Sequence, residues 1–139
     1  SINIQINAFG NENIDYIDGR AIVSCIERVY SSVPALIEKI HFNPEHPENH
    51  NVKITNKKLP YASVMGSNRR WKTVDKKNVI ETMVTNGYNL LDEKYEDNKN
   101  NIAPSKQKRF KELKNRFEKD EKTLMKKLKT DTELLILNS

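Results

Sequence analysis

The sequence is poor in cysteine, glycine, tryptophan and long apolar runs. Its single cysteine excludes an internal disulfide, and its four glycines form no glycine-rich loop of the kind that cradles nucleotide phosphates. No nucleophile elbow or Cys/His spacing typical of a hydrolase is present. Nothing in the sequence resembles a secretory signal or a run of about 20 apolar residues. These absences predict an intracellular protein without a membrane span and without a cofactor.

The chain has enough apolar residues for one modest core. Of its 139 residues 36% are hydrophobic and 31% are charged, which suits a single domain of this size. We predict a compact α+β domain over residues 1–97, a polar, Asn-rich hinge over 98–104, and an amphipathic helix over 105–139. Because the first residue is Ser1 rather than Met, we also expect the chain to be a piece of a longer protein.

Charge is unevenly distributed along the chain. Residues 1–52 carry a net charge of −4, whereas residues 53–77 hold eight basic side chains against one acidic, and residues 105–139 come to +5. The eight are Lys53, Lys57, Lys58, Arg69, Arg70, Lys72, Lys76 and Lys77. Such segregation indicates a polyanionic partner, although lysine-rich surfaces also serve solubility alone.

Hydrophobic periodicity predicts the elements of the first half. Ile2, Ile4 and Ile6 alternate with polar residues, as in a short strand. Apolar residues at helical spacing predict helices over about 18–31 and 33–41. Asp18 or Asp15 would cap the first helix and Ser32 the second, with Leu36, Ile37 and Ile40 facing inward.

Three short strands are predicted next, over about 52–55, 61–65 and 69–74. The last two meet across Gly66-Ser67-Asn68, a connection typical of a hairpin, so we expect an antiparallel sheet. Trp71 lies within this basic hairpin. We interpret its ring as part of the core, since large aromatic side chains are highly buried on average, and the basic residues as the solvated side.

Helices follow the sheet. Asp75 would cap a helix that Asn86-Gly87 ends, and a short helix over 88–95 would continue the chain. Ser105 would cap one long C-terminal helix of about 30 residues, roughly 45 Å in length. Its apolar stripe, imperfect at Asp120, would pack on the domain or pair with a second copy as an oligomerisation surface; it comprises Phe110, Leu113, Phe117, Leu124 and Leu128.

The joint between helices and sheet holds all three histidines, His41, His46 and His50, close to Asn49 and Asn51. The flanking prolines and short polar side chains favour a structural loop held by hydrogen bonds. Two alternatives stay open, since histidines four apart are also used in metal sites and a His/Asn loop before a hairpin is found in one-metal nucleases.

The chain resembles one family in three places. These are the run Ile-Asn-Ala-Phe-Gly-Asn-Glu-Asn at 6–13, residues 33–43, and the sequence Pro-Glu-Asn-His-Asn at 47–51, followed by the basic hairpin with Trp71. The pattern is similar to a C-terminal domain of giant-virus proteins that often follows a Cys2His2-like zinc finger. The finger is absent here. The resemblance implies a viral origin, in host cytoplasm, viral factory or nucleus, and proximity to nucleic acid.

These observations predict a non-enzymatic module of a large DNA virus protein that assists nucleic-acid binding or assembly. A metal-dependent nuclease using the 41–51 loop is one alternative, and a pure oligomerisation or protein-interaction domain is another.

Overall fold

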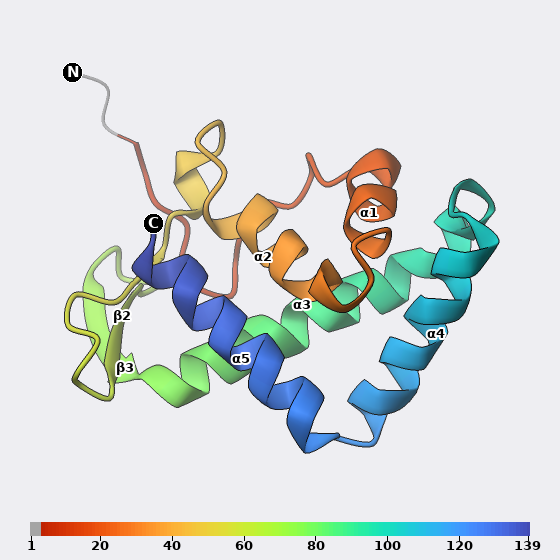
Figure 1. Cartoon of the computed structure of the whole chain (residues 1–139). Helices are drawn as coiled ribbons and strands as arrows, with labels where there is room; N and C mark the ends of the chain where they lie inside the picture. Colours follow the sequence, from red (N-terminus) through yellow and green to blue (C-terminus); the bar gives the residue numbers. More distant parts are fainter. Residues whose placement is uncertain (1–3) are drawn as a thin grey trace.

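The computed structural model describes residues 4–139, which form five α-helices and one three-stranded antiparallel sheet (Figure 1). The predicted α+β class is therefore confirmed. The sheet lies at one end of the molecule, beside the N-terminus of the longest helix (Figure 1). Of the strand predicted at the N-terminus, Ile2 lies outside the described residues, and Ile4 and Ile6 lie in a segment without regular secondary structure, so the prediction is wrong for these two residues.

The first helix begins at a predicted capping residue, whereas the second begins one residue earlier than its predicted cap allows. In α1 (Gly19–Ile26) the side chain of Asp18 accepts a hydrogen bond from the backbone N–H of Ala21 at 2.9 Å. The predicted 18–31 helix ends early because Val29 has a φ of +56°, in the left-handed region. A 3-10 turn, η1 (Val29–Ser31), leads into α2 (Ser32–His41), whose N-cap is Ser31 rather than Ser32.

The sheet follows the predicted hairpin pattern. Strands β1 (Val52–Lys53), β2 (Tyr61–Met65) and β3 (Trp71–Asp75) lie in that order, and each antiparallel pair is consecutive in sequence. The buried Val52, Ala62 and Val64 join the hydrophobic core together with residues of the next helix. One face of the sheet is therefore packed and the other faces solvent.

Helix α3 (Lys76–Asn98) runs without interruption through Asn86-Gly87, so the predicted stop at this pair is wrong. Gly87 is buried against α2, and a Cβ at this position would lie 3.3 Å from Val33 Cγ1 and 3.4 Å from Ile37 Cγ1. The glycine allows two helices to approach closely rather than ending one of them. Asp75 caps this helix as predicted, since its carboxylate accepts from the backbone N–H groups of Lys77 and Asn78.

The predicted single C-terminal helix is two helices. After the 3-10 turn η3 (Lys99–Asn101) come α4 (Pro104–Glu118) and α5 (Lys122–Leu137), which are joined by a tight turn. The N-cap position of α4 is occupied by Ala103 and not by the predicted Ser105. Asp120 has a φ of +52°. Its N–H bonds the carbonyl of Phe117, and the N–H of Glu121 bonds the carbonyl of Arg116. This pattern is a Schellman motif, which ends α4 and reverses the chain.

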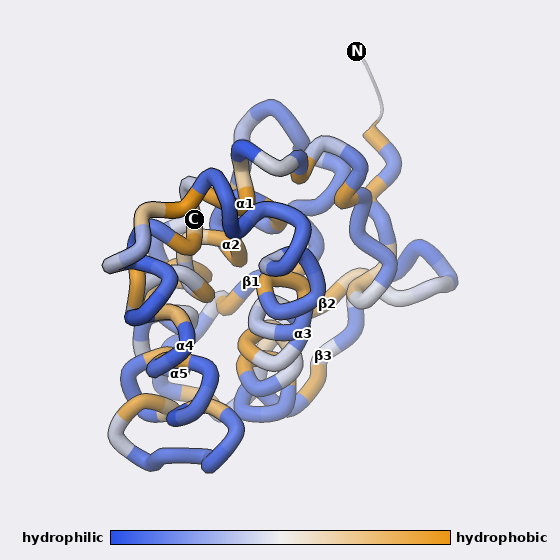
Figure 2. The backbone as a smooth tube through the Cα atoms, turned by 90° about the vertical axis from the view of Figure 1, so that its right-hand side faces the viewer, coloured by the Kyte–Doolittle hydropathy of each residue, from blue (hydrophilic) through white to orange (hydrophobic). Residues whose placement is uncertain are grey.

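The C-terminal pair completes the core instead of extending beyond it. Phe110, Leu113, Leu124 and Leu128 are at most 1% exposed and belong to the same buried cluster as the residues of α1 and α2. Figure 2 shows apolar segments alternating with polar ones along these helices. These four residues of the predicted oligomerisation surface are covered by their own chain, and the fifth, Phe117, is half-buried and stacks on Tyr88. The predicted hinge also contains a buried core residue, Ile102.

Within residues 4–139, none of the helices has the length and apolar character needed to cross a membrane.

Candidate nucleic-acid interface

The solvent-facing side of the sheet carries Lys53, Tyr61 and Trp71. In the β2–β3 ladder Tyr61 lies opposite Asp75 and Met65 opposite Trp71, and Lys53 of β1 lies opposite Ser63. Because side chains alternate along a strand, the three share one face, opposite to that of Ala62 and Val64. Tyr61 and Trp71 are four positions apart along the ladder, a separation of roughly 13 Å.

Trp71 is part of this surface and not of the core, so the prediction that its ring is buried is wrong. The side chain is 39% exposed, and Tyr61 is 53% exposed. The ammonium of Lys53 lies 4.1 Å from the centre of the Trp71 ring, a cation–π contact. The ring is outside the core because Trp71 pairs with Met65 and therefore lies on the strand face opposite to that of Ala62, Val64 and Val74.

Four of the predicted basic residues lie on the two loops that connect the strands. Lys57 and Lys58 are exposed in the β1–β2 connection, next to Leu59, which is 48% exposed. Arg69 and Arg70 are exposed in the β2–β3 turn, where Arg69 has a φ of +64°. The side chain of Asn68 accepts a hydrogen bond from the backbone N–H of Arg70 at 3.1 Å, which helps to fix the turn.

The other predicted basic residues are placed differently. Lys72 opposes Val64, so it projects from the packed side of the sheet at its open edge, where it lines a groove with Phe9 and Asn78. Lys76 pairs with Glu133 at 3.5 Å and donates to the carbonyl of Lys57, so its charge is partly compensated. Lys77 is exposed in the first turn of α3. The eight residues therefore form one basic end of the molecule but not a single face.

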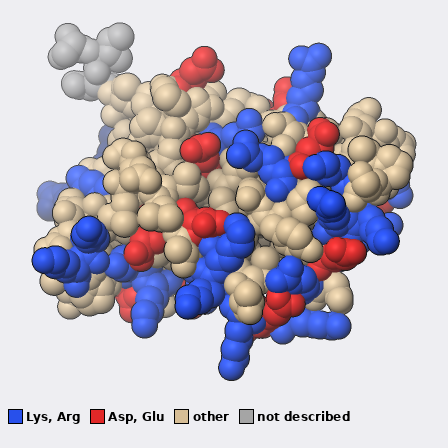
Figure 3. Space-filling view, viewed as in Figure 1, with Lys and Arg blue, Asp and Glu red and all other residues tan. Residues whose placement is uncertain are grey.

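The space-filling view shows the same arrangement. Lysine and arginine side chains gather at the left-hand end in Figure 3, where Figure 1 places β2 and β3. Basic side chains also follow the lower edge of the molecule, but there they alternate with acidic ones. Within residues 53–77 the only carboxylate is that of Asp75, which serves as the helix cap. The positive field is thus least compensated around the sheet.

The loop before the sheet is tied to the N-terminal segment by buried asparagines. Asn49 is fully buried, and its Oδ1 accepts from the N–H of Asn13 at 2.9 Å and from the amide of Asn7 at 3.2 Å. Its own amide donates to the carbonyl of Asn13 at 2.6 Å. Asn51 is also fully buried and donates to the carbonyl of Asn7 and to Glu12. Every polar atom of these two side chains has a partner within the fold.

Each histidine makes a separate bond within this region. His41 Nδ1 lies 2.9 Å from Asn51 Oδ1, and His46 Nδ1 lies 3.1 Å from Glu48 Oε2. His50 Nε2 donates to the backbone carbonyl of Asn43 at 2.7 Å. No group of three or more His, Cys, Asp or Glu side chains in the described part of the chain is placed to hold a metal ion. The geometry favours the structural interpretation of the loop over the metal-binding one.

Two pKa shifts reflect this packing. Burial lowers the pKa of His41, an effect that the nearby Glu12 carboxylate opposes. Tyr16 stacks on His46 with ring centres 3.4 Å apart, and burial raises the pKa of its phenol. Neither group is poised as a general acid or base near the basic end of the sheet.

Sequence reasoning missed the aromatic character of the exposed face. The signal was available, since Tyr61, Trp71 and Lys53 all occupy the strand positions that alternate with Ala62, Val64 and Val74. In comparisons of the chain with family models, curated proteins and solved structures, no match was found. The resemblance to giant-virus proteins therefore stays a prediction.

Proposed function

We propose that the protein binds single-stranded nucleic acid through the solvent-facing side of its sheet and catalyses no reaction there. The observation that carries this proposal is the exposure of Trp71, the only tryptophan of the chain, within its most basic segment. Burial of a tryptophan is strongly favourable, so an indole kept at the surface among cations is well suited to stack on a ligand.

The chemistry of the face suits a single strand. Bases stack on exposed aromatic rings with about 1–3 kcal/mol each, and every base offers a π-face, so such binding tolerates many sequences. Lys53 beside the ring and Arg69 and Arg70 on the adjoining turn supply cations within reach of the backbone phosphates. In a duplex the base faces are already stacked on each other, so the two rings would contribute little.

This activity is compatible with an accessory role in a large DNA virus protein, as the resemblance implies. The alternative of a metal-dependent nuclease is less well supported, because the three histidines each bond a different partner in the loop. The alternative of self-association through the C-terminal helix is less well supported, because four of the five residues of its apolar stripe are at most 1% exposed.

The proposal is tested by fluorescence anisotropy with labelled single-stranded and duplex oligonucleotides at about 50 mM salt, where weak electrostatic association is favoured. We expect tighter binding of the single strand, and weaker binding after Lys53→Gln. A matched control is Lys122→Gln, an exposed lysine on α5 far from the sheet in sequence and fold. Equal affinity for single strand and duplex, or equal effects of the two substitutions, would refute the proposal.

A further inference from the structure

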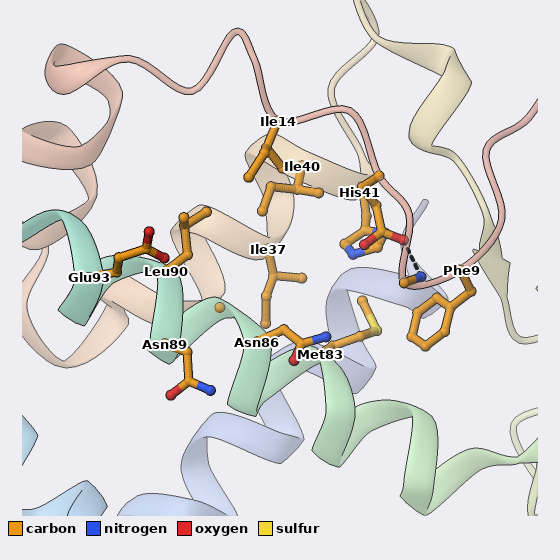
Figure 4. A pocket seen from close by; sticks show the side chains of 13 residues that line it. Phe9, Ile14, Ile37, Ile40, His41, Met83, Asn86, Asn89, Leu90 and Glu93 are labelled. Carbon is orange, nitrogen blue, oxygen red and sulfur yellow. Dashed lines mark hydrogen bonds between the residues drawn. The ribbon is translucent and has the colours of Figure 1, made fainter.

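A cavity on the opposite side of α2 from the C-terminal helices remains outside the proposed nucleic-acid interface. It has a volume of about 370 Å³ and lies between α2, α3 and the segment 9–14. This volume is within the range of small-molecule sites, roughly 300–1,000 Å³. In Figure 4, Glu93 lies at one end and His41 and Phe9 lie at the other, with Ile37, Ile40 and Leu90 between them.

The charges around the cavity are all of one sign. Its lining includes the carboxylates of Glu12 and Glu93 but neither lysine nor arginine, although the whole chain carries a net charge of +5. Among the described residues neither carboxylate forms an ion pair with a basic side chain. The cavity therefore suits a cation and repels anions such as phosphate.

At the end of the cavity formed by Glu12 and the buried His41, the free hydrogen-bonding groups are acceptors. The amide nitrogen of Asn51 donates to Glu12 Oε2 at 2.7 Å and to the carbonyl of Asn7, so Asn51 Oδ1 must accept from His41 Nδ1. The ring proton of His41 is then on Nδ1, which leaves the lone pair of Nε2 as an acceptor. Glu12 Oε2 accepts from Asn51 and from the N–H of Gly10, while Oε1 accepts no hydrogen bond from residues 4–139.

The other end of the cavity, at the exposed Glu93, is also acidic and rich in hydrogen-bond acceptors. Glu93 is an exposed residue of α3, and Asn86 and Asn89 precede it on the rim of the cavity. From Met83 to Glu93 the helix rises about 15 Å. The wall between the two carboxylates is apolar, formed by Ile37, Ile40 and Leu90. A ligand that matches this order of groups has a cation at each end and a hydrocarbon chain between them.

We propose that this cavity binds a linear aliphatic diamine or polyamine, one ammonium at Glu12 and His41 and the other at Glu93. The methylene chain packs on Ile37, Ile40 and Leu90, and the carboxylates accept charge-assisted hydrogen bonds from the ammonium groups. A monoamine satisfies one end only, and a diol lacks the charge that both ends select. The site shares no residue with the aromatic face of the sheet and does not depend on nucleic-acid binding.

The proposal is tested with the full chain by calorimetry and by methyl NMR, using putrescine, cadaverine and spermidine as probes. Butylamine and butanediol serve as control ligands. We expect saturable diamine binding that shifts the methyl signals of Ile37, Ile40 and Leu90, at least about tenfold tighter than butylamine. An absence of saturable binding, or shifts spread over acidic surface residues and equal for butylamine, would overturn the proposal.

A substitution at Glu93 distinguishes binding in this cavity from nonspecific attraction of cations to acidic residues. Glu93→Gln removes one charge from an exposed position and should leave the fold intact, while it weakens diamine binding about tenfold and butylamine binding much less. Glu112→Gln on α4 makes the same change of charge outside the cavity and should leave both affinities unchanged. Equal effects of the two substitutions would contradict a site at this cavity.

Discussion

The ammonium of Lys53 lies 4.1 Å from the centre of the Trp71 ring, and both side chains project from the solvent-facing side of the sheet. The contact joins the first strand to the third across β2. It places a cation and the chain's only tryptophan at the same point of the surface. Aromatic surface and positive charge are therefore combined where a single strand could use both.

Replacing Lys53, Arg69 and Arg70 together with glutamine should weaken nucleic-acid binding for all sequences. Each phosphate contact on a single strand contributes about 0.7 to the slope of log affinity against log salt, so loss of three contacts should reduce the slope by about 2. Thermal stability should change little, because exposed charges contribute little to folding. Anisotropy titrations at several salt concentrations measure the slope.

A second triple variant controls for net charge. Lys108, Lys111 and Lys122 are exposed on α4 and α5, and their replacement with glutamine changes the charge by the same amount. We expect this variant to retain the salt slope of the unmodified protein. An equal reduction in both variants would show that overall charge, and not the basic end at the sheet, controls binding.

Asn49→Ala should destabilise the fold by about 2–3 kcal/mol. The substitution truncates a fully buried side chain and leaves the N–H and carbonyl of the half-buried Asn13 without their partner, and unsatisfied groups of this kind carry a desolvation cost. Urea unfolding measures the loss. Asn115→Ala, at an exposed position of α4, should change stability by less than about 0.5 kcal/mol. If the two variants were equally stable, the asparagine network would not hold the loop.

Gly87→Leu should destabilise the protein by more than about 2 kcal/mol, because the added side chain must displace Val33 and Ile37 of α2. The neighbouring substitution Asn86→Ala should be neutral or slightly stabilising, since Asn86 is exposed and alanine is the better helix former. Thermal unfolding of both variants compares them. A stable Gly87→Leu protein would mean that close approach of the helices is not the reason for this glycine.

Stability should fall as the pH is lowered through the range below about 6.5. Burial holds the pKa of His41 below its ordinary value of 6.5, so in this range the unfolded chain takes up a proton that the folded chain does not. In His41→Asn an amide can replace the Nδ1–H group without titrating, and the pH dependence should be smaller. Urea unfolding at about pH 7.5 and about pH 5.5, one unit on either side of the ordinary pKa of histidine, gives the comparison. An unchanged pH dependence in the variant would exclude His41 as its source.

The sequence predicted the fold class and most elements because their signals are local. Asp18 and Asp75 cap helices as expected, and the hairpin around Gly66 follows from alternation and turn chemistry. Asn86-Gly87 misled because the same dipeptide ends a helix or permits close packing, depending on whether a second helix lies against it. The deciding information lies in α2, which is about fifty residues earlier in the sequence, and not in the dipeptide itself.

At the C-terminal helix pair the sequence does contain the relevant signal, but the signal was interpreted as an imperfection of one long helix. Asp120 interrupts the apolar repeat, a signal that the sequence does contain, and the structure shows that the interruption is a turn. For the candidate site, too, one part could be predicted from the sequence and another could not. The cluster of basic residues is visible in the sequence, whereas the exposure of Trp71 depends on which face of the sheet α3 covers. The cavity could not be predicted, because its lining comes from three separate segments.

The most direct test of the central claim uses the fluorescence of Trp71, since no other tryptophan contributes to the signal. Titration with a single-stranded oligonucleotide at about 50 mM salt should quench this fluorescence in step with the anisotropy of the labelled strand. Trp71→Phe should retain much of the affinity, whereas Trp71→Ala should lose about 1–3 kcal/mol of binding with the fold intact. If the strand bound without quenching, or Trp71→Ala bound as tightly as the unmodified protein, the sheet face would not be the binding site.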